Sequence, residues 1–236
     1  PEAIAAMTKA CASDSNISVL EVKAKYPEGG ERNLIGVVTG RQLRFGQLPA
    51  DLGCVVCNVS TLNAIYRAVC KTEPLMGRLF TVSGDAVANP HTLFVRIGTS
   101  CSELLEAAGG IKPGSEARKI LCGGPMMGIA MSTLDAPVAK NNNALTVLAS
   151  DEVELAEQQM TACLRCGRCG HVCPIGLVPQ MMAEAAERQD YERYEKKLYG
   201  LDCIACGSCT YICPAKRPLM QLFKQTKAAI MAAKRK

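Results

Sequence analysis

The pattern of apolar side chains over the first 75 residues alternates between helical and extended spacing. It predicts a helix over residues 1–11, a strand over residues 17–25 and a second helix over residues 63–71. A short run of apolar and β-branched residues at 54–59 has the composition of a strand. The turn-rich segment 26–31 predicts a sharp loop, or a place where the backbone approaches a ligand. Together these elements indicate the latter part of an α/β domain.

Residues 76–149 carry short strand patterns separated by glycine turns, which predict a small mixed sheet crossed by one helix. The helix should end at Gly109-Gly110, because glycine is a common C-terminal stop. From residue 150 onward only helical patterns remain, and Ser150 is predicted to cap the first of these helices. The predicted strands are residues 79–82, 93–97, 120–122 and 144–148, and the predicted helices are residues 102–108, 178–188, 190–199 and one that begins at Pro218.

Composition narrows the class of protein. The 236 residues are 48% hydrophobic and 21% charged, the balance of a folded globular chain, and they include no uncharged apolar stretch of the length that spans a bilayer. No transmembrane segment of its own is therefore expected. With 4% aromatic residues and no Trp, the chain lacks stacking platforms, so no nucleic-acid partner is expected. The seven Lys and Arg between positions 216 and 236 are expected to form a solvated helix face, with an acidic partner or an anionic lipid surface as alternatives.

Fourteen cysteines are the most informative feature of the composition. Eight form two runs of identical spacing, Cys-x2-Cys-x2-Cys-x3-Cys-Pro, placed 40 residues apart. This is the run of bacterial ferredoxins, which binds [4Fe–4S] clusters and whose fourth cysteine serves the other cluster. Three thiolates at this stride can hold three corners of one cuboidal cluster, and the fourth is expected to open the next helix with its proline in the first turn. The predicted ligands are Cys163, Cys166, Cys169 and Cys213 for cluster 1, and Cys203, Cys206, Cys209 and Cys173 for cluster 2.

Structural zinc is the main alternative for these runs. Zinc takes four ligands, usually as two cysteine pairs separated by a longer loop, whereas each run places its cysteines at one short stride without such a loop, and the run occurs twice. The other six cysteines are expected to be small buried hydrophobes, including Cys54 and Cys57 despite their redox-motif spacing. His171, inside the first run, is expected to face solvent, and the Met126-Met127 pair is expected to pack rather than to ligate.

With both runs placed, the chain resembles the C subunit of the Rnf-type electron transport complex over essentially its whole length. Cysteine runs of this kind occur in many ferredoxin modules, whereas the Gly-Gly-Pro-Met-Met-Gly block at 123–128 beside them is fairly specific to this family. The other segments that carry the resemblance are residues 25–32, 48–49, 58–61, 81–85 and 214–218.

The resemblance implies an α+β multidomain fold in three parts. These are the remnant of an α/β flavin- and NADH-binding domain (residues 1–75), a β-grasp-like (SLBB) domain (76–149) and an α-helical, ferredoxin-like domain with two [4Fe–4S] clusters (150–236). It also implies a subunit of a membrane-associated ferredoxin:NAD oxidoreductase coupled to sodium or proton translocation. The cofactors would be the two clusters and, in the full-length subunit, FMN. The partners would be NAD or NADH and the other subunits of the complex, at the cytoplasmic face of the bacterial inner membrane.

By the same resemblance, Glu31, Asn58 and Thr61 match positions near the flavin of the related subunit of respiratory complex I. Gly30 and Ser60 stand where that pattern has acidic residues. The glycine-rich nucleotide loop of the family is expected to precede Pro1, so this chain alone should bind FMN or NADH weakly. No residue is predicted to act as an acid, base or nucleophile, because the redox chemistry belongs to the cofactors.

Two other functions fit the same sequence. The chain could be the iron–sulfur subunit of a soluble flavin-dependent reductase, such as a corrinoid-reducing or hydrogenase-associated enzyme, because the cysteine runs do not separate these cases. It could also be a zinc-stapled interaction module that binds an acidic partner through its basic C-terminal helix.

Overall fold

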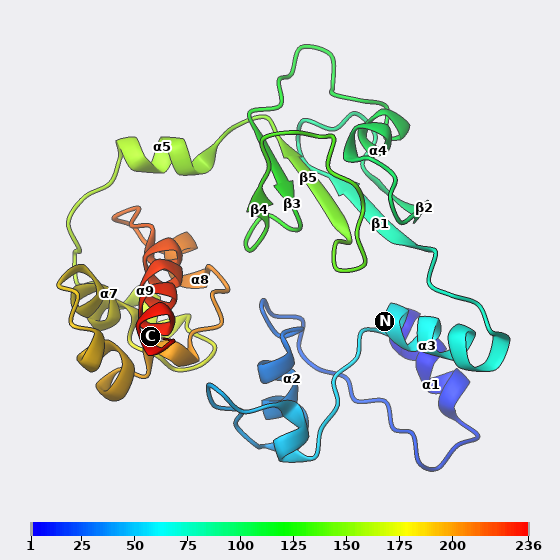
Figure 1. The fold of residues 1–236 in the computed structure, drawn as a ribbon, viewed down its shortest axis with the longest axis horizontal. Coiled ribbons are helices and arrows are strands. Elements are labelled where there is room, and N and C mark those ends of the chain that lie inside the picture. Colours follow the sequence, from blue (N-terminus) through cyan, green and yellow to red (C-terminus); the bar gives the residue numbers. More distant parts are fainter. Residues whose placement is uncertain (1, 236) are drawn as a thin grey trace. The chain divides into compact units, whose positions relative to one another are not determined.

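The computed structural model describes residues 2–235, and the chain divides into two compact units, Pro1–Val56 and Cys57–Lys236. The first unit contains α1 (Glu2–Cys11), α2 (Glu31–Thr39) and the 3-10 turn η1 (Pro49–Leu52). Among its described residues only Ile35 and Leu43 are buried. Irregular chain connects these short elements (Figure 1).

The strand predicted over residues 17–25 is wrong, because this segment is irregular. Alternating side chains make a strand only when a second strand pairs with them, and the described part of the first unit has no strand. The helix α2 was not predicted. It follows the turn-rich segment directly and ends where Gly40 adopts the left-handed conformation (φ 70°), which glycine reaches without strain.

The run at 54–59 is not a strand either, because Val59 already begins α3 (Val59–Lys71), the first helix of the second unit. Asn58 determines this start: its side-chain oxygen accepts a hydrogen bond from the backbone N–H of Ser60 at 2.9 Å. Asparagine is among the best N-cap residues, so a local hydrogen bond overrides the strand propensity of the neighbouring valines. The predicted helix is found, four residues longer at its N-terminus.

A mixed five-stranded sheet forms the middle of the chain, in the order β2-β1-β5-β3-β4. β1 pairs antiparallel with β2 and parallel with β5, and β3 pairs antiparallel with both β5 and β4. All four predicted strands and the predicted helix are present (Figure 1). The elements are β1 (Gly77–Ser83), β2 (His91–Arg96), α4 (Cys101–Ala107), β3 (Lys119–Cys122), β4 (Ile129–Ala130) and β5 (Ala144–Leu148).

The core of this domain lies between the sheet and α4. Phe80 and Val82 of β1 and Leu145 of β5 are fully buried, and α4 contributes Leu104 and Leu105. A capping box starts α4, since Ser100 and Glu103 satisfy each other's backbone N–H groups. The apolar, alternating strands therefore hold the sheet to one helix, as their pattern predicts.

Between the last strand and residue 235, the regular elements are all helices or helical turns. They are α5 (Glu152–Gln158), α6 (Arg168–His171), α7 (Pro179–Glu187), the π-helical turn η2 (Arg193–Lys197), the 3-10 turn η3 (Gly200–Asp202), α8 (Ser208–Tyr211) and α9 (Leu219–Lys234). Two of the predicted helices, residues 178–188 and the one after Pro218, are α7 and α9. The helix predicted over 190–199 is instead interrupted by η2, which widens the backbone around Tyr194.

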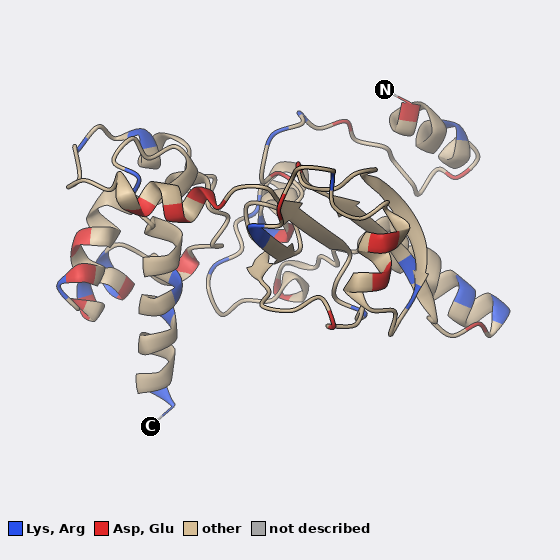
Figure 2. Ribbon diagram, turned by 90° about the horizontal axis from the view of Figure 1, so that it is seen from above, with Lys and Arg blue, Asp and Glu red and all other residues tan. Residues whose placement is uncertain are grey.

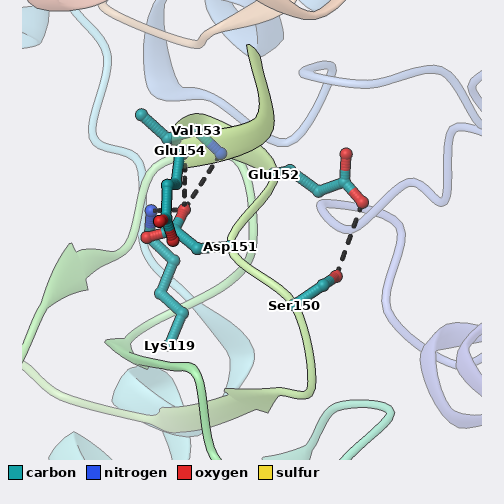
Figure 3. A network of polar contacts seen from close by, with 6 residues as sticks. All are labelled: Lys119, Ser150, Asp151, Glu152, Val153 and Glu154. Carbon is teal, nitrogen blue, oxygen red and sulfur yellow. Dashed lines mark hydrogen bonds and ion pairs between the residues drawn. The ribbon is translucent and has the colours of Figure 1, made fainter. Parts of the chain in front are cut away.

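Asp151, not Ser150, caps α5. Its Oδ1 accepts hydrogen bonds from the backbone N–H groups of Val153 at 2.9 Å and Glu154 at 3.4 Å, while the Ser150 hydroxyl donates to Glu152 at 3.5 Å (Figure 3). The same carboxylate pairs with the ammonium of Lys119 on β3. Both charged side chains are mostly buried. The capping thus ties the first helix after the sheet to a strand, a contact that no local pattern reveals.

Candidate metal centres

The two cysteine runs fold into two copies of one backbone motif. Gly167 and Gly207 both adopt positive φ (76° and 84°), and each precedes a four-residue helix, α6 or α8. Two positions upstream, Arg165 and Ala205 both have φ 53°. The repeated spacing of the sequence therefore corresponds to a repeated local structure, in which the chain wraps around a similar volume twice.

The fourth cysteine of each run begins a β-turn, not a helix. The carbonyl of Cys173 accepts a hydrogen bond from Gly176 N–H at 3.1 Å, and the carbonyl of Cys213 accepts one from Lys216 N–H at 3.1 Å. Proline follows each cysteine because position i+1 of such a turn suits its fixed φ. The prediction that proline lies in the first turn of a helix is wrong, and α7 and α9 begin five residues later.

Four of the cysteines line one cavity of about 410 Å³, counted with the space open to solvent. Three of them belong to the first run, and the fourth, Cys213, comes from the second run. The wall also includes Gln180 of α7 and Arg217. We call this cavity site 1; its cysteines are Cys163, Cys166, Cys169 and Cys213.

The other four cysteines line a second cavity of about 400 Å³. Here the second run supplies three thiols and the first run supplies Cys173. Met220 and Phe223 of α9 complete the wall. We call this cavity site 2; its cysteines are Cys203, Cys206, Cys209 and Cys173.

Backbone N–H groups point at several of these sulfurs. Leu177 N–H donates to Cys173 Sγ at 3.3 Å, and Ala205 N–H donates to Cys203 Sγ at 3.4 Å. In site 1 the Cys169 thiol donates to the side-chain oxygen of Gln180 at 3.3 Å. Such N–H donors stabilise negative charge on sulfur, which is what a thiolate-bound iron–sulfur group places there.

The cysteines of site 2 are more buried than those of site 1. Burial raises the pKa of Cys209 to about 12, and the nearby thiols, Cys173 among them, add to this shift. Burial likewise raises the pKa of Cys203 and, in site 1, of Cys169. By contrast, Cys163 and Cys166 of site 1 are exposed. Without a bound metal these buried thiols are protonated at neutral pH, so metal binding must release their protons.

The residues of both sites fit an iron–sulfur cluster. Each cavity is lined by four thiols, the ligands that iron–sulfur clusters use, and in site 2 backbone N–H groups donate to two of the sulfurs. Among residues 2–235, no three His, Cys, Asp or Glu side chains are grouped as a single metal ion would need. His171, as predicted, is exposed at the end of α6.

Three residues of the sites have no signature in the cysteine spacing. Gln180 contacts Cys169, Lys227 lies close enough to Cys203 to lower its pKa in opposition to burial, and Tyr194 lies among the buried side chains beside site 2. The 40-residue repeat gives one indication of Gln180. Gln180 and Met220 occupy equivalent positions after the two runs, and each lines one of the two cavities. Tyr194 and Lys227 reach site 2 through tertiary packing alone.

Of the remaining six cysteines, predicted to be buried, five differ from the prediction. Only Cys101 is buried, within the core under α4. Cys57 and Cys70 are exposed, and Cys11, Cys54 and Cys122 are half-buried. Cys54 and Cys57 lie on irregular chain between two helices, so there is no strand to bury them.

The basic C-terminal segment is partly neutralised within its own domain. Arg217 pairs with Glu187 of α7, and Lys234 pairs with Glu195 of η2. The ammonium of Lys227 donates to the carbonyl of Leu201 at 3.0 Å. Basic residues follow α9 along its length, as Figure 2 shows, but three basic residues of the segment are thus bound to neighbouring elements. Lys236 lies outside the described residues.

The residues predicted near a flavin lie in different units. Glu31 begins α2 in the first unit, whereas Asn58 and Thr61 lie at the start of α3 in the second. All three are exposed. Asn58 is already engaged as the cap of α3. Their flavin role stays a prediction.

Comparison with known families divides the chain into three matches. Residues 1–67 match the family model for the Nuo51 FMN-binding domain, residues 79–130 match the SLBB domain, and residues 162–217 match the 4Fe-4S dicluster domain. The predicted flavin residues fall in the first match and all eight predicted cluster cysteines in the third. These matches confirm the predicted fold class and its cofactors, two [4Fe–4S] clusters and FMN.

Individual relatives extend over nearly the whole chain. It is 43% identical over 233 residues to the C subunit of the proton-translocating ferredoxin:NAD(+) oxidoreductase complex of Clostridium ljungdahlii, an alignment of 99% of this chain and 50% of that protein. It is 41% identical over 235 residues to the C subunit of the Na(+)-translocating complex of Acetobacterium woodii, covering 100% of this chain and 52% of the relative. The C subunit of an ion-translocating oxidoreductase complex of Yersinia pestis bv. Antiqua is 40% identical over 232 residues, covering 98% of this chain and 37% of that protein.

Over nearly its whole length the chain is therefore similar to the C subunits of ion-translocating oxidoreductase complexes of the Rnf type. It spans about half the length, or less, of the three relatives named. Among residues 2–235, no helix has the length and apolar character that crossing a membrane requires. All three relatives are named as subunits of ion-translocating complexes.

Proposed function

We propose that this chain relays electrons through two [4Fe–4S] clusters within an Rnf-type complex. One observation carries the proposal: each of two cavities of the cysteine-rich domain is lined by three cysteines of one run and the fourth cysteine of the other. That pairing is what a double-cluster ferredoxin requires, and it occurs in a chain whose relatives are named as parts of ferredoxin:NAD(+) oxidoreductase complexes.

The eight cysteines are proposed as the ligands, with the crossed sets of site 1 and site 2. When bound, each cluster takes up and releases single electrons. The protein holds the thiolates in place, donates backbone N–H groups to sulfur and limits the access of water, most strongly at site 2. Cys163 and Cys166 of site 1 are exposed, so a redox partner can come closer to a cluster in site 1 than to one in site 2. Site 1 is therefore the proposed point of electron exchange with that partner.

The wider function rests on the relatives. We propose that the complete subunit binds FMN in its Nuo51-like domain and exchanges electrons with NAD or NADH. It would dock on the other subunits of the complex at the cytoplasmic face of the cell membrane. Electron flow between ferredoxin and NAD would drive sodium or proton translocation by the complex. Within this scheme the domain boundaries near residues 75 and 150 and the flavin contacts of Glu31, Asn58 and Thr61 are part of the proposal.

Anaerobic reconstitution tests the cluster content. The chain should take up about eight iron and eight sulfide, and its reduced form should give EPR signals altered by magnetic interaction between two neighbouring clusters. One or two zinc ions per chain and no sulfide would reject the proposal in favour of the zinc-stapled module. Truncation after Pro218 tests the zinc-stapled interaction module separately. Loss of binding to an acidic partner with unchanged metal content would support that module.

The placement in the complex needs its own test. Co-expression with the membrane subunits of an Rnf-type operon should retain the subunit in the membrane fraction, and salt washing should release it, because its described helices do not span the bilayer. Purification of the subunit with a soluble reductase instead would contradict the placement while leaving the clusters intact.

A further inference from the structure

Tyr194 is a fully buried side chain whose hydroxyl group has no hydrogen-bond partner among the described residues. A buried hydroxyl without a partner costs free energy, because it gives up its hydrogen bonds to water and gains none in return. Native structures keep such groups rarely, and a redox role or a bound group is one of the reasons they do. The hydroxyl therefore needs a partner that the described polypeptide itself does not supply.

Three features hold the Tyr194 ring in one place. The π-helical turn η2 carries it inward, and its ring centroid lies 6.2 Å from that of Phe223, a residue in the wall of site 2. Gly200 makes room for it, since a Cβ at that position would lie 2.2 Å from one ring carbon and 2.4 Å from the carbon that bears the hydroxyl. π-helical turns are rare and occur often at functional sites.

The Tyr194 side chain lies near two cysteines of site 2. Gly200, against which one edge of the ring packs, begins the short turn η3, and Cys203 directly follows this turn. The charges of Cys203 and Cys209 act on the Tyr194 hydroxyl and, after burial, are what raises its pKa. Two of the site 2 thiols therefore lie within electrostatic reach of the orphaned hydroxyl.

The equivalent position in the first run carries no such donor. The residue 40 positions before Tyr194 is Glu154, which lies on the exposed helix α5. The two sites thus share their cysteine geometry but differ in this one buried donor. A group that served only to fill the core would be expected as phenylalanine, which has the same ring and no hydroxyl.

We propose that the Tyr194 hydroxyl donates a hydrogen bond to sulfur of the cluster bound in site 2, and so raises the reduction potential of that cluster. This inference rests on the proposed function, because it needs a cluster in site 2. Reduction adds one electron to the cluster and negative charge to its sulfurs, and a donor stabilises the reduced form more than the oxidised form. The proton stays on the tyrosine oxygen throughout.

The test compares Tyr194→Phe with Tyr191→Phe in the reconstituted chain. Tyr191 precedes η2 in the same segment and is 37% exposed, so its variant controls for the loss of a tyrosine hydroxyl there. EPR-monitored titration should show the reduction equilibrium of the site 2 cluster shifted about tenfold against reduction in Tyr194→Phe, which is about 59 mV for one electron. The site 1 cluster and both clusters of Tyr191→Phe should keep their potentials.

Three results separate the possible failures. Fewer than eight iron in the unaltered chain would overturn the proposed clusters. Eight iron with equal potentials in Tyr194→Phe and the unaltered chain would overturn the tyrosine proposal alone. If Tyr194→Phe loses the site 2 cluster altogether, the hydroxyl is structural and the tuning proposal fails. As an independent readout, ENDOR of the protein in deuterium oxide should show an exchangeable deuteron coupled to the site 2 cluster that is missing in Tyr194→Phe.

Discussion

Cys173 and Cys203 lie in the wall of one cavity although they belong to different cysteine runs. Cys169 and Cys213 repeat this relationship in the other cavity, and the charge of Cys213 contributes to the raised pKa of Cys169 after burial. Neither cavity is complete until both runs are folded. Metal binding at either site would therefore join the two halves of the domain, and its binding free energy would become folding free energy.

Cys173→Ala should remove the cluster of site 2, although its position lies in the first run. The remaining three thiols of that site would leave one iron without a protein ligand. We expect iron and sulfide to fall from about eight to about four per chain, and the surviving EPR signal to lose the features of magnetic interaction. Cys213→Ala should remove the other cluster, so the two variants should leave different signals.

An exposed cysteine provides the control for both variants. Cys70→Ala alters a thiol on α3, away from the two runs, and should keep full iron content. If Cys173→Ala instead abolishes the signal that Cys213→Ala is expected to abolish, the ligand sets are not crossed.

The grouping of the eight cysteines in two cavities could be predicted because their spacing is local and repeated. β5 and the C-terminal helix were predicted for a related reason, since each carries an uninterrupted apolar pattern between clear stop signals. The strand expected over residues 17–25 failed because its alternation says nothing about a pairing partner. Local capping by Asn58 likewise displaced an expected strand.

What surrounds the sites could not be predicted from spacing. Tyr194 approaches site 2 only because η2 departs from regular α-helix and Gly200 leaves space for the ring. Both conditions depend on tertiary packing between segments that no periodicity connects. The proline of each run was assigned to a helix start, although it occupies a turn, because both positions accept its fixed φ.

Gln180→Met should lower the reduction potential of site 1 and leave that of site 2 unchanged. The Gln180 side chain contacts Cys169 Sγ at 3.3 Å, and once Cys169 is a thiolate the same amide can turn its N–H₂ group to the sulfur. Loss of that donor should shift the potential by about −60 mV, a tenfold change for one electron. Methionine is the matched choice because Met220 occupies the equivalent position at site 2.

The control variant is Gln221→Met, which alters an exposed residue of α9. The reduction potentials of both clusters should be measured in Gln180→Met and in this control. The control should keep both potentials. A shift at site 2 in Gln180→Met, or none at site 1, would show that the amide does not act on the first cluster.

Gly200→Ala should destabilise the cluster domain far more than Gly170→Ala. A Cβ on Gly200 would overlap the ring of Tyr194 at 2.2 Å, whereas the nearest contact of a Cβ on Gly170 is Gln180 at an ordinary 3.8 Å. Overpacking of a buried ring costs about 3 kcal/mol, and we expect the thermal midpoint of the reconstituted chain to fall by about 6–12 °C. Gly170→Ala should remain within about 2 °C of the unaltered chain. Equal midpoints for the two variants would mean that Tyr194 can move away, which contradicts its fixed position.

Asp151→Ala should fray α5 and expose it to proteolysis. The helix has seven residues, none of them buried, so its stability depends on the cap and on the Lys119 ion pair that Asp151 provides. Loss of both should cost about 1–2 kcal/mol locally and speed cleavage by a Glu-specific protease after Glu152, Glu154 or Glu157 roughly tenfold. Ser150→Ala, which removes only a hydroxyl outside the cap, should be cleaved at the unaltered rate.

The pH dependence of this cleavage tests the charge of the cap. Burial acts to raise the pKa of Asp151, but the Lys119 hydrogen bond and the N–H groups of Val153 and Glu154 outweigh it, so the pKa is lowered. A carboxylate with a lowered folded-state pKa contributes stability above its unfolded pKa of about 3.9 and loses it as the pH falls through the folded value. Protection of α5 should therefore persist from pH 7 to pH 5. At pH 5 the unaltered chain should still be cleaved more slowly in α5 than Asp151→Ala. Equal cleavage rates at pH 5 would show that the Asp151 carboxylate is not stabilised as an anion in the folded chain.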